Sequence, residues 1–173
     1  MCPRAKTGTV GERGLAARPY AGGGRMSTIR VVVADDDDTM RRAMVDALVA
    51  HGGFTVVADV GTGAELPQLV AETHAQLVVL DVRMPAGGAA AAHLVRTSEP
   101  YPVVVAVSAS NDVPTVAAML RAGATGFLAK GHLGTTFAND LVRCMRGQVL
   151  IAVPQGVHVL RALGDAGLGG PRP

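Results

Sequence analysis

Five short runs rich in valine, isoleucine and leucine dominate this chain, at residues 29–34, 54–60, 76–82, 102–107 and 124–129. The runs are nearly continuous in apolar residues instead of alternating apolar with polar, which predicts strands that are buried on both faces. Longer segments that can form helices separate the runs, so strands and helices alternate along the chain. We therefore predict an α/β fold: a doubly wound, five-stranded parallel sheet with helices on both faces.

The segments between the runs carry helical signals. Met40, Met44 and Leu48 recur at every fourth position, which predicts an amphipathic helix that ends at the glycine pair Gly52-Gly53. Further helices are predicted near residues 66–70, 89–96, 113–122 and 136–146. Each of the five predicted strands is thus followed by a predicted helix.

The formal net charge of +2 is unevenly distributed along the sequence. Residues 1–25 hold five basic residues and one acidic residue, a charge of +4, which leaves −2 for residues 26–173. The stretch 1–25 has no apolar period, so we predict a disordered basic extension there. We predict a folded domain over 26–148 and a linker helix with a flexible tail over 149–173. Because the folded part is acidic, we expect no nucleic-acid contact through these 173 residues, and DNA binding would require a further domain.

Hydropathy and cysteine content indicate the cellular compartment of the protein. No apolar stretch approaches the roughly 18 uncharged residues that span a membrane, so we predict a soluble protein without a membrane partner. Cys2 and Cys144 are far apart in the sequence, which is more typical of a reducing compartment than of a disulfide framework. The predicted location is the cytoplasm.

Polar residues follow four of the five predicted strands. Four consecutive carboxylates, Asp35 to Asp38, come after the first strand, and Asp81 comes at the end of the third. Ser108 follows the fourth strand and Lys130, the only lysine of the predicted folded domain, follows the fifth. Since the carboxyl ends of parallel strands meet at one edge of the sheet, we expect these side chains to converge there.

The expected convergence points to phosphate chemistry. Crowded carboxylates repel one another, and a hard cation such as Mg²⁺ relieves the repulsion through oxygen ligands. A carboxylate can attack phosphorus to give an aspartyl phosphate, while the cation, an ammonium group and a hydroxyl stabilise the transferred group. Lys130 and Ser108 supply that ammonium and that hydroxyl.

Four motifs occur in this order along the chain: VVVADDDDTMRRAMVDAL, VVLDVRMP, VVAVSAS and RAGATGFLAKG. Together they resemble the receiver domain of bacterial two-component response regulators, over about residues 28–147. RAGATGFLAKG and the following GQVLIAVPQGVHVLRAL are most similar to receivers of the LuxR/NarL type. The resemblance implies a flavodoxin-like receiver over 26–148 that accepts phosphate from a histidine kinase and forms a homodimer. It also implies that the protein is not an enzyme but a phosphoacceptor that assists its own phosphorylation and dephosphorylation.

The resemblance also implies roles for individual residues. Asp81 matches the phosphoacceptor, and Asp35, Asp36, Asp81 and the main-chain carbonyl of Arg83 match the groups that hold Mg²⁺. Three residues match the groups that bind the phosphoryl group or switch with it, namely Ser108, Lys130 and the aromatic Phe127. Three others are expected to modulate the reaction: Ala109, which leaves the phosphoryl group accessible, and the additional carboxylates Asp37 and Asp38. Control of transcription would follow through an output domain not contained in these residues.

Two alternatives remain open. The sequence Asp35-Asp36-Asp37-Asp38-Thr39 also fits the DxDxT pattern of haloacid-dehalogenase-like phosphatases, with Asp35 as nucleophile and Asp37 as general acid and base. That hypothesis leaves Asp81 and the residues after it unexplained, and it lacks an acidic pair after a late strand. The second alternative is a pseudo-receiver, an interaction module that never takes up phosphate. The five histidines have no ligand spacing, so we predict no metal site at them.

Overall fold

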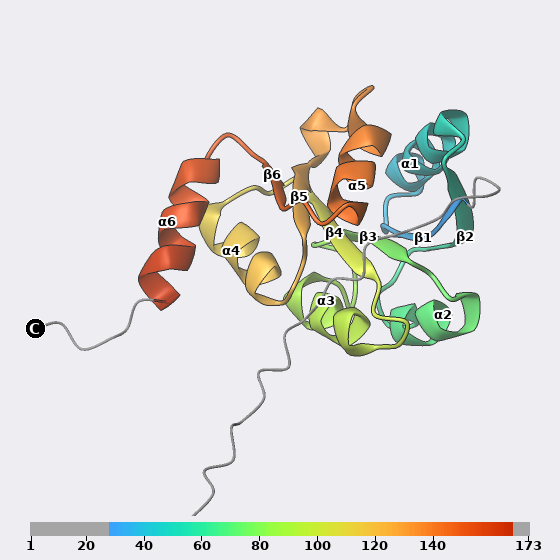
Figure 1. Ribbon diagram of the computed structural model, residues 1–173, viewed down its shortest axis with the longest axis horizontal. Helices are drawn as coiled ribbons and strands as arrows, with labels where there is room; N and C mark the ends of the chain where they lie inside the picture. Colours follow the sequence, from blue (N-terminus) through green and yellow to red (C-terminus); the bar gives the residue numbers. More distant parts are fainter. Residues whose placement is uncertain (1–27, 168–173) are drawn as a thin grey trace, which may run out of the picture.

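One six-stranded parallel sheet forms the centre of the computed structural model, which describes residues 28–167 (Figure 1). The strands are β1 (Ile29–Ala34), β2 (Phe54–Val60), β3 (Leu77–Asp81), β4 (Val103–Ser108), β5 (Gly126–Ala129) and β6 (Leu150–Ala152). The helices are α1 (Asp38–His51), α2 (Leu66–Thr73), α3 (Gly88–Thr97), α4 (Val113–Arg121), the 3-10 helix η1 (Lys130–His132), α5 (Phe137–Met145) and α6 (Gly156–Gly167). The predicted basic extension at 1–25 and the last residues of the predicted tail lie outside the described residues.

The order of strands in the sheet is β2-β1-β3-β4-β5-β6, and all neighbouring strands are parallel. From β1 the chain first proceeds outward to β2, then crosses back over β1 to β3 and continues toward the opposite edge. The doubly wound prediction is therefore confirmed. In such sheets the point where the winding reverses, here between β1 and β3, opens a crevice at the carboxyl ends of the strands.

Two layers of helices bury the sheet on both faces. Helices α1 and α5 cover one face, whereas α2, α3 and α4 cover the other (Figure 1). In β1, Val31 and Val33 pack into the α1 and α5 layer, and Val32 and Ala34 pack into the opposite layer. All four side chains are fully buried, which is the physical reason why the strand is a continuous apolar run.

The prediction of five strands is wrong by one strand. Residues Leu150–Ala152, which lie in the predicted linker segment, form β6 and pair in parallel with β5, with Ile151 opposite Phe127. The short apolar run before Pro154 predicts an extended piece, but nothing in the local sequence indicates that this piece joins the sheet. The open edge of β5 provides the backbone partners that make β6 a strand.

Helix α6 follows β6 and packs against α4 (Figure 1). Val159 of α6 is fully buried in the same core cluster as Val116 and Met119 of α4. The guanidinium of Arg121 donates from Nη2 to the main-chain carbonyl of Ala162 at 2.9 Å. These contacts attach the described part of the predicted linker segment to the helical layer, and the domain boundary at residue 148 stays a prediction.

Local signals set the ends of the first helix. Asp37 accepts at Oδ1 from the N–H groups of Thr39 and Met40, at 2.9 and 3.1 Å, and so caps the N-terminus of α1. Gly52 ends the helix with a positive φ of 74°, a conformation that favours glycine. Within residues 28–167, no helix has both the length and the apolar character required to cross a membrane.

Cys144 of α5 is expected to resist thiol reagents in the folded protein. Its side chain is buried against β5, where a Cβ added to Gly126 would lie only 2.9 Å from the Cys144 Sγ atom. Burial raises the pKa of the Cys144 thiol to about 11, so little thiolate forms at neutral pH. In a Cys2→Ser variant, we expect Ellman's reagent to label the native protein at least about 100-fold more slowly than the urea-unfolded protein. Rapid stoichiometric labelling of the native variant would contradict this burial.

Candidate functional site

The four polar strand ends lie together at the carboxyl edge of the sheet, as predicted. Ala34 of β1 pairs with Leu80 of β3, so Asp35 and Asp81 both come one step later on adjacent strands. Ser108 is the last residue of β4 and pairs with Ala129 of β5, directly before Lys130. The parallel register thus brings Asp35, Asp81, Ser108 and Lys130 to neighbouring positions.

Lys130 joins the two buried carboxylates. Its Nζ atom lies 2.7 Å from Oδ2 of Asp35 and 3.2 Å from Oδ2 of Asp81. Asp35 is fully buried and Asp81 is only 3% exposed, whereas the Lys130 side chain reaches the cluster from a partly exposed position. One ammonium group therefore pairs with two carboxylates, so the three groups together carry a net negative charge.

The environment changes the ionisation of both partners. Burial raises the pKa of the Asp81 carboxyl, while the ammonium of Lys130 lowers it and the charge of Asp35 raises it again. Burial lowers the pKa of Lys130, but the hydrogen bond to Asp35 and the charges of Asp81 and Asp35 outweigh this effect and raise it. Lys130 is therefore held in its charged form, and Asp81 is a carboxylate that a further cation would stabilise.

The carboxylates fit a hard divalent cation. One oxygen each of Asp35, Asp36 and Asp81 can be chosen so that all three lie within 4.8 Å of one another. Asp81 Oδ1 is buried and has no hydrogen-bond partner among the described residues. Asp36 is exposed and opens the cluster to solvent. A buried oxygen without a donor, surrounded by further carboxylates, is the environment in which Mg²⁺ finds oxygen ligands and keeps some of its water.

The other predicted residues surround this cluster. Ser108 is fully buried and its Oγ accepts from the N–H of Ser110 at 3.1 Å, so its own O–H remains available to donate. Ala109 is exposed at the start of the β4–α4 loop, and Arg83 is exposed in the loop after β3. Phe127 lies three residues before Lys130 and is fully buried in the core cluster that contains Val159 of α6.

Asp37 and Asp38 lie outside the carboxylate cluster. Asp37 caps helix α1, and Asp38 forms an ion pair with Arg41. Both charges therefore have local partners, and their predicted effect on phosphate chemistry stays a prediction. Arg41 was not selected from the sequence, although its spacing of three residues from Asp38 on a predicted helix is a signal for such an ion pair.

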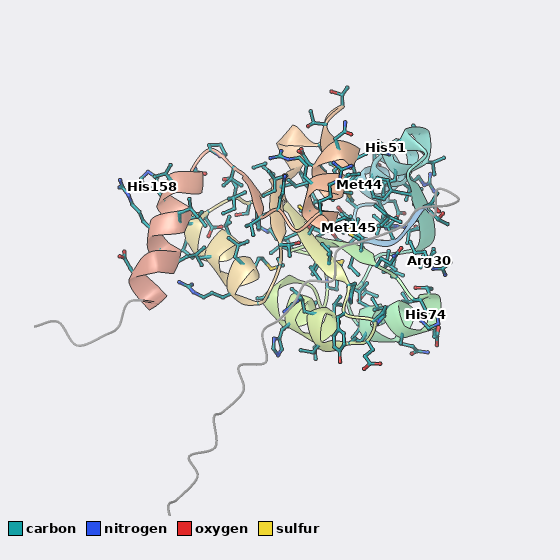
Figure 2. All side chains as sticks on the ribbon, viewed as in Figure 1. Arg30, Met44, His51, His74, Met145 and His158 are labelled. Atoms are coloured by element: carbon teal, nitrogen blue, oxygen red, sulfur yellow. The ribbon has the colours of Figure 1, made fainter. Side chains whose placement is uncertain are left out.

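The histidines do not converge. Figure 2 shows His51 near the end of α1, His74 beyond the end of α2, and His158 on α6, well separated across the molecule. In the part of the chain that the structure describes, Asp35, Asp36 and Asp81 are the one group of His, Cys, Asp or Glu with the geometry to hold a metal ion.

The doubly wound sheet carries an acidic cluster and a lysine at its carboxyl edge, as expected for a receiver domain. A family model described as the response regulator receiver domain matches residues 31–136, and the chain belongs to this family. The chain is therefore the receiver module of a two-component response regulator, a class of signalling domain.

The relatives of this chain include regulators named NarL and GacA. The sequence is 34% identical over 125 residues to a protein from Mycobacterium tuberculosis named probable transcriptional regulatory protein NarL, covering 72% of this chain and 58% of the relative. It is 34% identical over 119 residues to response regulator GacA of Pseudomonas protegens, covering 68% of this chain and 54% of the relative. The solved signal receiver domain of the M. tuberculosis NarL matches with a TM-score of 0.66 and 34% identity, over 70% of this chain and 98% of that domain. The chain thus spans little more than half of the length of these two full-length relatives.

Proposed function

We propose that the chain is phosphorylated on Asp81, in a Mg²⁺-dependent transfer from a histidine kinase, and that this modification switches a protein surface. The observation that carries the proposal is the state of Asp81 at the end of β3. Asp81 is 3% exposed, and one of its carboxylate oxygens has no hydrogen-bond partner among the described residues. Its carboxylate lies beside Lys130 and two further carboxylates.

The transfer itself is a substitution at phosphorus. The Asp81 carboxylate attacks the phosphorus of a phosphohistidine or of acetyl phosphate and forms a P–O bond. The P–N or P–O bond of the donor breaks, and the imidazole or acetate leaves with the electron pair. Asp35, Asp36, Asp81 and the main-chain carbonyl of Arg83 would hold Mg²⁺, which supplies charge neutralisation to the phosphoryl oxygens.

Two side chains would bind the new phosphoryl group. The ammonium of Lys130 already lies between Asp35 and Asp81 and can move its hydrogen bond to a phosphoryl oxygen. The free O–H of Ser108 donates to another. Phe127 shares a core cluster with residues of α4 and α6. Repacking of Phe127 is the proposed means by which this core responds to phosphorylation.

The output is proposed from the relatives. The name of the NarL relative describes it as a probable transcriptional regulatory protein, and the same role for this chain would act through a domain beyond the receiver. A homodimer, a partner kinase and action in the cytoplasm belong to this proposal and rest on the receiver resemblance.

The phosphatase alternative is disfavoured by the position of Asp37. In that scheme Asp37 acts on the substrate held by Asp35, but its Oδ1 accepts two main-chain hydrogen bonds at the start of α1. The carboxylate cluster instead joins Asp35 to Asp36 and to Asp81.

The proposal predicts a Mg²⁺-dependent phosphoryl adduct. We expect intact-mass spectrometry after incubation with acetyl phosphate and Mg²⁺ to show one added phosphoryl group, which is lost on treatment with hydroxylamine because an acyl phosphate is labile. Addition of EDTA in place of Mg²⁺ is expected to prevent the adduct. A chain that stays unmodified under all conditions is a pseudo-receiver, and sustained hydrolysis of p-nitrophenyl phosphate that depends on Asp35 identifies a phosphatase.

A further inference from the structure

The loop that carries the acidic pair is held by a side chain outside the carboxylate cluster. Arg41, in the first turns of α1, places its guanidinium among groups from three segments. Nη1 donates to the main-chain carbonyl oxygen of Asp35 at 2.7 Å, and Nε donates to Oδ1 of Asp59 in β2 at 2.9 Å. Nη2 donates to Oδ1 of Asp38. The Arg41 side chain is only 16% exposed, and its contact with the Asp35 carbonyl is partly buried, whereas Asp38 and Asp59 are exposed.

Each polar group of Asp35 contacts a neighbouring residue. Its N–H donates to the carbonyl of Val60 at 3.0 Å, and its carbonyl oxygen accepts from Arg41. Its carboxylate accepts from the N–H of Asp37 at Oδ1 and pairs with Lys130 at Oδ2. The peptide group between Asp35 and Asp36 is therefore anchored on its carbonyl side by a single side chain, that of Arg41.

Asp36 depends on this anchor. Its side chain is exposed and makes no hydrogen bond or ion pair with another residue in the range 28–167, yet its carboxylate lies within 4.8 Å of those of Asp35 and Asp81. No side-chain contact orients the Asp36 carboxylate, so its direction is set by the backbone of Asp36. That orientation follows from the peptide plane whose carbonyl oxygen Arg41 binds.

We propose that Arg41 is a positioning residue for the cation site: by holding the Asp35 carbonyl it aims the Asp36 carboxylate at Asp35 and Asp81. Asp59 and Asp38 orient the guanidinium and compensate its charge, as second contacts do around metal ligands in other proteins. This inference rests on the proposed function, because it assumes that Mg²⁺ binds at these three carboxylates.

Substituting Arg41 distinguishes a positioning role from a purely electrostatic effect on Mg²⁺ binding. Loss of a positive charge near the carboxylates would by Coulomb attraction strengthen Mg²⁺ binding. Loss of the hydrogen bond to the Asp35 carbonyl would weaken Mg²⁺ binding, because Asp36 would sample other orientations. The two effects have opposite signs, so the direction of the change identifies the role.

The test is calorimetric titration of the unphosphorylated protein with Mg²⁺, with acetyl phosphate labelling as a second readout. We expect Arg41→Gln to raise the Mg²⁺ dissociation constant about tenfold or more, and Arg41→Lys to restore little, since an ammonium cannot bridge all three acceptors. Labelling at saturating Mg²⁺ is expected to approach the wild-type rate, because the phosphoacceptor is intact. The matched control is Arg42→Gln, which removes the same charge from the adjacent, exposed position of α1 and should leave the constant within about twofold of wild type.

The outcomes are distinguishable. Equal or tighter Mg²⁺ binding by Arg41→Gln overturns the inference while the proposed function stands. If wild type binds no Mg²⁺ and takes no phosphate, the proposed function itself fails. Should Arg41→Gln not fold by circular dichroism, Arg41→Lys decides. It keeps the positive charge but cannot donate to all three acceptors at once, so weaker Mg²⁺ binding by a folded Arg41→Lys supports positioning, whereas unchanged binding refutes it.

Discussion

Asp81→Asn is expected to abolish the acetyl phosphate adduct completely. The amide cannot act as the nucleophile toward phosphorus, and no other carboxylate of the cluster lies at the end of β3 beside Lys130. Intact-mass spectrometry with Mg²⁺ should therefore show the unmodified mass only, under conditions that fully label wild type.

A matched control separates the loss of the nucleophile from the loss of a charge. Asp46→Asn makes the same chemical change at an exposed position of α1 and is expected to label like wild type. Peptide mapping then locates the phosphoryl group. A labile phosphate that persists in Asp81→Asn, on Asp35 or Asp36, would show that the nucleophile has been assigned to the wrong carboxylate.

Lys130→Met is expected to lower the free energy of unfolding by about 3–5 kcal/mol at pH 7 in the absence of Mg²⁺. The substitution removes the ammonium that lies 2.7 Å from Asp35 and 3.2 Å from Asp81, and it leaves two buried carboxylates with no cationic partner. Urea unfolding followed by circular dichroism measures the change.

The loss should depend on pH in a defined direction. The pKa of Asp81 is already raised above its ordinary value of 3.8, chiefly by burial, and it rises further without Lys130. A carboxyl group with a raised pKa in the folded state opposes folding once it ionises, so its cost is absent below the unfolded pKa and grows as pH rises through the folded pKa. Lys130→Met is therefore expected to be closest to wild type in mildly acidic solution and least stable at alkaline pH.

A second substitution tests the cause. Asp81→Asn in the Lys130→Met background removes one of the two unpaired charges and is expected to restore part of the lost stability, whereas the Asp46→Asn control should restore none. Strict additivity of the Lys130 and Asp81 substitutions would contradict the coupling that the distances indicate.

The positions of the first five strands and the residues at their ends could be predicted because both depend on local sequence. Runs such as Val31 to Ala34 are apolar at every position, since both faces of a central parallel strand are buried. In a parallel sheet the residues that follow these strands share one edge. The meeting of Asp35, Asp81 and Lys130 follows from that geometry without knowledge of any side-chain contact.

The remaining features depend on contacts that join distant parts of the sequence. Residues Leu150–Ala152 become a strand because the edge of β5 is open to them, and Val159 becomes a core residue because α6 reaches α4. The sequence also shows four equivalent carboxylates in a row, and their separate roles come from the bend between β1 and α1. That bend turns Asp37 to the helix N-terminus and Asp38 to Arg41.

The order of strands and helices and the chemistry at the strand ends follow from local sequence, because burial and backbone periodicity restrict the residue types at neighbouring positions. Long-range contacts select the carboxylates that form the cluster, add β6 to the sheet and bring Arg41 to the carbonyl of Asp35. Each of these features needs partners from separate segments, such as Asp59 of β2 for Arg41 of α1, and such partners cannot be predicted from local sequence patterns.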